Sequence, residues 1–88
     1  MKRSPDFMKR KIGTRYVIVA VGKATKRLGG MISINATGAA IWDLLAEDMS
    51  EDALLEALLS RYEVDRDTVK TDLDAFLTSL KEVGAIVA

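Results

Sequence analysis

The chain has 88 residues, of which 49% are hydrophobic, and its 13 basic residues balance 13 acidic ones. This length fits one domain and leaves no room for a second. The sequence contains neither Cys nor His, which excludes disulfides, argues against a structural zinc site, and removes the usual general base and the best nucleophile. We therefore expect no catalytic residues, no metal site and no cofactor.

The distribution of charge is uneven along the chain. Residues 1–27 carry nine basic residues against one acidic residue, net +8, whereas residues 28–88 carry four against twelve, net −8. This uneven distribution indicates either an interaction surface or a chance separation of basic and acidic residues on solvent-exposed faces. The longest apolar run, Tyr16 to Val21, is far shorter than a membrane span, and no secretory signal follows Met1. These features predict a cytoplasmic protein without membrane contact.

Three short strands are predicted in the first part of the chain. They cover Phe7 to Ile12, Tyr16 to Val21, which is rich in β-branched and aromatic residues, and Met31 to Ile34. Residues 1–6 are expected to form a flexible N-terminus. A single domain then covers residues 7–88.

Apolar residues spaced by three and four predict three helices after these strands. The first, capped by Asn35 or Thr37, extends to about Glu47, and the others cover residues 50–62 and 65–83. The expected fold class is α+β, winged helix-turn-helix-like, with three N-terminal antiparallel strands followed by three helices.

Three segments resemble the PqqD-like family. Residues 32–45 read Ile-Ser-Ile-Asn-Ala-Thr-Gly-Ala-Ala-Ile-Trp-Asp-Leu-Leu and resemble its strand-to-helix junction. Residues 58–65 match a second segment of the family pattern, and residues 69–80, followed by Gly84-Ala85-Ile86, match a third. The resemblance covers about residues 7 to 87. It is closer to the broad PqqD-like set than to the proteins of the pyrroloquinoline quinone pathway, so it leaves the peptide product open.

The resemblance implies a non-catalytic recognition element for ribosomally made, post-translationally modified peptides, which serve natural-product biosynthesis. In this family the leader segment of a precursor peptide adds as a strand beside the third strand, next to the third helix. Main-chain hydrogen bonds then give affinity, and pockets for alternate side chains give specificity. The implied partners are the precursor peptide and a separate radical-SAM, cyclase or peptidase-type enzyme that modifies it.

Carried onto this sequence, the resemblance implies a peptide groove with two walls. The strand edge is formed by Met31, Ile32, Ser33, Ile34 and Asn35. The helical wall is formed by Val69, Asp72, Leu73 and Phe76. Burial tendencies favour Ile32, Ile34, Leu73 and Phe76 as core residues rather than direct contacts, and favour Met31, Ser33 and Asp72 as exposed contacts. Arg15, Lys26 and Arg27 are expected to flank the groove and to attract acidic residues of the peptide.

Other functions remain open on the sequence alone. A winged-helix DNA-binding regulator is disfavoured, because the second and third predicted helices each carry a net charge of −2 and phosphates require the opposite sign. An enzyme is disfavoured because Asp72 and Asp74, two positions apart on a helix, point to different sides. A dimerisation module that pairs through the third strand is compatible with peptide binding, so the chain is expected to be a monomer or an edge-paired dimer.

Overall fold

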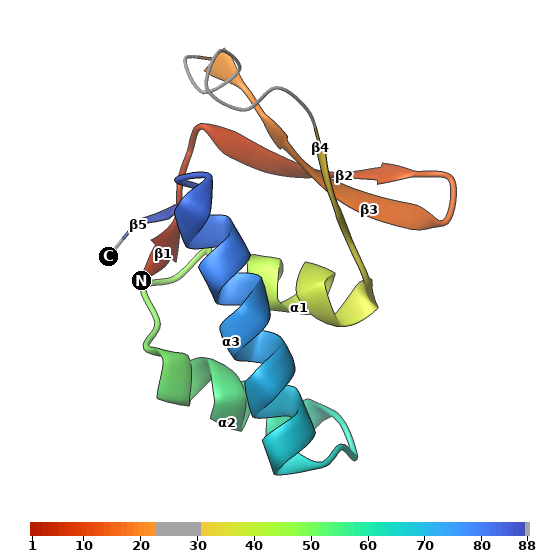
Figure 1. Cartoon of the computed structure of the whole chain (residues 1–88), viewed down its shortest axis with the longest axis vertical. Coiled ribbons are helices and arrows are strands. Elements are labelled where there is room, and N and C mark those ends of the chain that lie inside the picture. Colours follow the sequence, from red (N-terminus) through yellow and green to blue (C-terminus); the bar gives the residue numbers. More distant parts are fainter. Residues whose placement is uncertain (23–30, 88) are drawn as a thin grey trace.

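A computed structural model of the chain describes residues 1–22 and 31–87, and of Met31 only the backbone. Figure 1 shows a small sheet at one end of the molecule and three helices that pack below it. The elements in chain order are β1 (Lys2–Arg3), β2 (Phe7–Ile12), β3 (Arg15–Ala20), β4 (Met31–Ile34), α1 (Ala36–Leu44), α2 (Glu51–Arg61), α3 (Arg66–Glu82) and β5 (Ile86–Val87).

The main sheet has three antiparallel strands in the order β2-β3-β4. Gly13, in the turn between β2 and β3, has a φ of 63°, a conformation that suits glycine in a tight hairpin. Ile18 lies opposite Lys9 of β2 and opposite Ile32 of β4. The three strands predicted from the sequence are confirmed, with the middle one starting one residue earlier and ending at Ala20.

Each helix begins with a side-chain cap. Asn35, Ser50 and Asp65 accept hydrogen bonds from backbone amides at the starts of α1, α2 and α3, which satisfies one amide that the helix leaves unpaired. α1 ends at Leu44 rather than near Glu47, because after the cap residue Leu45 the amides of Ala46 and Glu47 bond to carbonyls three residues back, as in a turn. Gly84 has a φ of 75° after α3, as expected for the residue that ends a helix.

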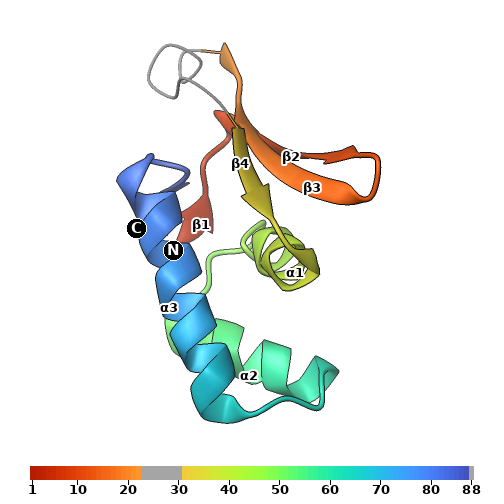
Figure 2. The ribbon, with the colours of Figure 1, turned by 45° about the vertical axis from the view of Figure 1, so that its right-hand side comes forward.

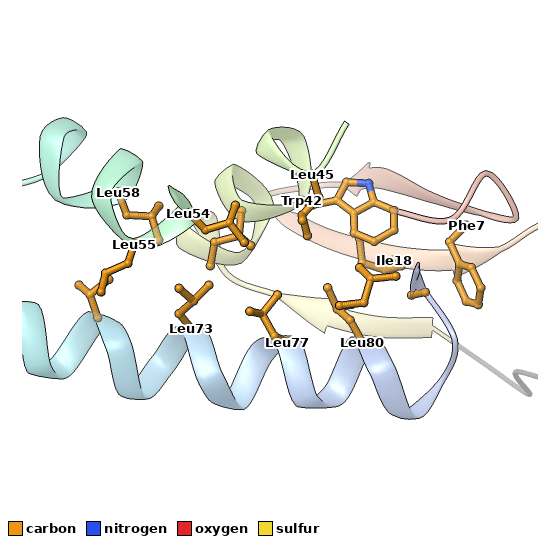
Figure 3. Close-up of a cluster of buried hydrophobic side chains, with 14 residues drawn as sticks. Phe7, Ile18, Trp42, Leu45, Leu54, Leu55, Leu58, Leu73, Leu77 and Leu80 are labelled. Atoms are coloured by element: carbon orange, nitrogen blue, oxygen red, sulfur yellow. The ribbon is translucent and has the colours of Figure 1, made fainter. Parts of the chain in front are cut away.

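The core lies between the inner face of the sheet and the three helices. Leu73, Leu77 and Leu80 of α3 face the leucines of α2 and the Trp42–Ile18 contact between α1 and the sheet (Figure 3). These three leucines follow the spacing of one helix face. Burial of these leucines holds α3 against the other helices. The adjacent side of α3 then faces β4.

The N-terminal segment differs from the flexible terminus expected for residues 1–6. Lys2 and Arg3 form β1, which pairs antiparallel with β5, and the amide of Arg3 donates to the carbonyl of Leu45 at 2.9 Å. Ser4 is buried, and its amide donates to Ala85 at 2.8 Å. This pairing could not be predicted from the sequence, because two-residue strands are too short to carry a periodic pattern.

The observed class is therefore α+β, with antiparallel sheets and three helices after the main strands, as predicted. Among the described residues, no helix combines the length and the apolar character that a membrane crossing needs.

Candidate functional site

β4 forms one edge of the main sheet. Within the described residues its only paired neighbour is β3, and Figure 2 shows α3 on the side of β4 opposite the β2–β3 hairpin. Opposed residues of antiparallel strands share a face, so Ile32 and Ile34, opposite Ile18 and Tyr16, point to the helical side. Ser33 points to the other face and is exposed. The inner face of β4 thus joins the core, while no strand in the described part of the chain pairs with its outer edge.

A cavity of about 280 Å³ lies between the end of β4, the start of α1 and the middle of α3. We call it the β4–α3 hollow. Its lining combines strand, turn and helix residues: Ser33, Ile34, Asn35, Thr37, Gly38, Ile41, Asp72, Ala75 and Phe76. The hollow is therefore placed where a segment added to β4 would lie against α3.

A second cavity, of about 240 Å³, lies further along α3. We call it the α2–α3 hollow. It is lined by Thr37, Leu58, Tyr62, Val64, Asp65, Thr68, Val69 and Asp72. Tyr62 and Val64 are 43% and 46% exposed, so both side chains are accessible from this hollow. Because Thr37 and Asp72 line both hollows, we treat the two as one groove.

The residues predicted for the peptide site fall into two groups. Ser33, Ile34, Asn35, Asp72 and Phe76 line the β4–α3 hollow, and Val69 lines the α2–α3 hollow. Leu73 is fully buried and Ile32 is packed against the core. Ile34 and Phe76 are only partly buried, so these two serve the core and the groove together. Met31 lies at the start of β4 and its side chain is not described.

Asn35 and Gly38 hold β4 close to α1. The Asn35 Oδ1 accepts a hydrogen bond from the Gly38 amide at 2.8 Å. A Cβ placed on Gly38 would lie 3.2 Å from the Ile34 Cβ, closer than ordinary van der Waals contact, and 3.4 Å from Phe76 Cε1, at the short limit of such contact. Glycine at this position therefore permits the close approach that forms the floor of the hollow.

The charged residues of the groove are acidic. Asp65 caps α3, and hydrogen bonds from the backbone amide and the hydroxyl of Thr68 lower the pKa of its carboxyl group, which therefore stays ionised at neutral pH. Asp72 is exposed. Neither hollow is lined by Lys or Arg.

The expected electrostatic flank is only partly described. Arg15 is exposed at the start of β3, and the register from Tyr16 to Ile34 places it at the same end of the sheet as Asn35. Lys26 and Arg27 lie outside the described residues.

Sequence reasoning missed several residues that line the groove, among them Thr37, Gly38 and Ala75. Small residues carry little signal of their own, although Ala75 follows Asp72 by three positions and precedes Phe76, so it lies on the same side of α3. Leu58, Tyr62 and Val64 were missed as groove residues because leucine and tyrosine at helical spacing indicate core. Their position depends on how α2 meets α3.

A larger cavity, of about 650 Å³, lies elsewhere, between β1, the start of β2 and the end of α1. Three of its charged side chains already have partners within the protein. The Lys9 Nζ bonds both carboxylate oxygens of Asp43, at 2.8 and 2.9 Å, and the Arg3 guanidinium donates to the Trp42 carbonyl at 3.3 Å. Size alone therefore does not make it the functional site, and the groove beside β4 remains the stronger candidate.

Comparison with protein families gives one match. The model of the family described as "Coenzyme PQQ synthesis protein D (PqqD)" matches residues 15–86. This range includes β3, β4, all three helices and every described residue that lines the groove. No curated protein matches the chain.

Two solved structures resemble the whole chain. A structure of TbiB1 in complex with the TbiA(beta) leader peptide is 29% identical, has a TM-score of 0.72, and aligns over 97% of this chain and 93% of that one. A lasso peptide synthetase B1 complexed with the leader peptide is 28% identical, with a TM-score of 0.71 and coverage of 99% and 96%. Both similar chains were solved with a leader peptide bound.

Proposed function

The chain belongs to the PqqD family, and from this premise we propose that it binds the leader segment of a ribosomally made precursor peptide and presents that peptide to a separate modifying enzyme. The observation that carries the proposal is the outer edge of β4, which pairs with no other described strand and opens on a groove whose other wall is α3. The two similar structures bound to leader peptides support the same function.

We propose that the peptide binds as an added antiparallel strand beside β4. Edge strands carry a row of unpaired amides and carbonyls, and a second chain satisfies them without any change of fold. Alternate side chains of the added strand point towards the helices. Apolar side chains at those positions would enter the β4–α3 hollow against Ile34 and Phe76, which are partly buried and packed against the core.

Presentation needs no chemistry from this chain. A domain that holds the leader raises the effective concentration of the attached core peptide at the enzyme's active site. We therefore propose a non-catalytic role in the cytoplasm, where the precursor is synthesised, with a radical-SAM, cyclase or peptidase-type enzyme as partner. The folded unit that performs this role is proposed to be one domain, which includes β1 because β1 pairs with β5.

Paired proline variants of β4 test strand addition. Neighbouring amides in a strand point to opposite edges, so one of Ile32→Pro and Ser33→Pro removes a bond to β3 and the other removes an outward amide. Ile32 also packs against the core, so Ile32→Ala and Ser33→Ala serve as references for the lost side chains. We expect one proline variant to be less stable than its alanine reference, and the other to match its reference in stability but to bind the leader at least about tenfold more weakly, because ladder bonds supply the affinity. Circular dichroism measures the fold, and isothermal titration measures the binding.

An NMR titration with the leader peptide locates the residues that the peptide contacts. Chemical-shift changes should be confined to residues 31–35 and to the stripe of α3 formed by Val69, Asp72 and Phe76. Full affinity in the well-folded proline variant, or shifts on the β2 edge instead, would show that the peptide does not add to β4.

A winged helix-turn-helix DNA-binding protein is the alternative. We propose the description winged helix-turn-helix-like for this fold, with α2 and α3 as the two helices and the β2–β3 hairpin as the wing. Acidic residues outnumber basic ones on α3 and include Asp67, Asp72 and Asp74, and phosphates would repel them. Salt-dependent binding to random duplex DNA would favour this alternative.

A further inference from the structure

We propose that Asp72 selects leader peptides that carry a Lys or Arg on the N-terminal side of the segment paired with β4. The inference rests on the proposed function, because it assigns a specificity-determining contact within the same groove. It names the chemistry of the peptide, an apolar strand preceded by a basic side chain.

Asp72 lies at the junction of the two hollows. Together with Thr37 it lines both hollows, so it lies at the point where one hollow continues into the other. A chain that pairs with β4 and continues past Asn35 must pass between the start of α1 and Asp72. Asp72 is exposed, so its carboxylate is available to that chain.

The charge of Asp72 has no partner among the described residues. The three ion pairs found there join Met1 with Asp48, Lys9 with Asp43, and Arg66 with Glu56. Lys70 precedes Asp72 by two positions and therefore points to another side of α3. The nearest charged neighbour on the groove is Asp65, a second acid that is kept ionised as the cap of α3. A cation bound here would be attracted by both acids, and no lysine or arginine of residues 1–22 and 31–87 lines the groove to compete with it.

The direction of the peptide follows from the sheet. β4 runs from Met31 towards Asn35, so an antiparallel neighbour runs the opposite way, and its residues near Asn35 precede those near Met31. The basic residue that meets Asp72 therefore lies before the paired segment. Arg15, at the same end of the sheet, lies opposite Ile12 and next to Tyr16, which places it on the face away from the helices. One face of a peptide strand added to β4 would therefore meet the negative charge of Asp72, and the other face would lie on the side of the positively charged Arg15.

A selection from a random peptide library displayed on its own mRNA tests the inference. Wild-type protein, Asp72→Lys and Asp67→Lys are immobilised in parallel. Asp67 is an exposed acid on the same helix that lines neither hollow, so its variant matches the change in net charge. The wild type and Asp67→Lys should enrich Lys or Arg at a fixed distance before an alternating apolar segment. Asp72→Lys should enrich Asp or Glu at that same position.

A charge-swap cycle gives the magnitude. The consensus peptide and its Lys→Glu variant are titrated against the wild type and Asp72→Lys. Each mismatched pair should bind about tenfold more weakly than the matched pairs, and the double swap should restore affinity, with the difference shrinking at high salt. Enriched peptides with no charge preference, or the same preference in Asp72→Lys, would overturn the role of Asp72 and leave strand addition standing. If the wild type enriches no peptide, the proposed function fails as well.

Discussion

At the residue scale, Asn35 joins the strand and the helix that form the groove. It directly follows β4, and its side chain caps α1 through the Gly38 amide. The sequence suggested both a cap and a place on the peptide-binding edge for this residue. The cap is observed, whereas contact with a peptide stays a prediction.

The cap can be tested separately from the groove. Asn35→Ala should lower the free energy of unfolding by about 1 kcal/mol, because it leaves the Gly38 amide without an acceptor. Asn35→Asp should keep most of that free energy, since aspartate is an equally good cap. Urea denaturation followed by the fluorescence of the single tryptophan, Trp42, which is buried, measures both. Equal stability of the alanine and aspartate variants would show that the cap contributes little.

Gly38 offers a second test at this scale. Gly38→Val should lower the free energy of unfolding by about 1–3 kcal/mol, because the added atoms must displace Ile34 and Phe76 from their close approach to α1. The matched control is Ala36→Val, at the exposed start of the same helix, which should cost less than about 0.7 kcal/mol through helix propensity alone. Thermal unfolding by circular dichroism compares the two, and equal losses would contradict close packing at Gly38.

At the element scale, local patterns predicted the main strands and all three helices. Each of these has a signal within its own residues, such as the β-branched run of β3, the Ser50 cap of α2, or the leucine spacing of α3. β1 and β5 have no such signal, because a two-residue strand depends on a partner more than eighty positions away in the chain. The groove was predictable only in part, for the same reason. Asp72 and Phe76 followed from the resemblance, whereas Thr37 and Tyr62 enter through the packing of α1 and α2 on α3.

The contact between α2 and α3 gives the stability of the protein a pH dependence. A hydrogen bond between the carboxyl side chains of Glu51 and Asp74 raises the pKa of Glu51, and partial burial and the negative charge of Asp74 add to the effect. Folding therefore favours protonated Glu51. This contribution is present below the ordinary pKa of a glutamate and is lost as the pH rises through the raised value.

Asp74→Asn should remove this dependence. The amide can donate a hydrogen bond to the Glu51 carboxylate, so we expect the free energy of unfolding at pH 7 to rise by about 0.2–1 kcal/mol, the range of exposed charge contacts. The gain on acidification through the raised pKa should disappear. Urea denaturation between pH 4 and pH 7 measures this, with Glu63→Gln, an exposed acid between the helices, as the control. A variant whose stability keeps the pH dependence of the wild type would rule out the pair.

At the scale of the whole molecule, β1 and β5 join the two ends of the described chain. The amides of Arg3 and Ser4 bond to Leu45 and Ala85, so the N-terminal segment also ties α1 to the end of α3. The fold thereby keeps the sheet and the helical layer in one arrangement, on which the shape of the groove depends.

Deletion of residues 1–4 should therefore be costly. We expect the free energy of unfolding to fall by about 2–4 kcal/mol, as the loss of several backbone hydrogen bonds and of buried Ser4 predicts. Lys2→Ala keeps the backbone and changes only an exposed side chain, so it should stay within about 0.5 kcal/mol of the wild type. Urea denaturation compares them, and an unchanged midpoint after the deletion would restore the view of a flexible terminus.

The β2–β3 hairpin bears exposed Arg10, Lys11 and Arg15, whereas α2 and α3 carry most of the acids. A molecule with no net charge thus has a large electric dipole moment. It should rotate as it approaches any charged body, and it should be retained by cation-exchange and anion-exchange resins alike at low ionic strength. Although its net charge is zero, the protein should therefore present its basic end to an acidic partner and its acidic end to a basic one.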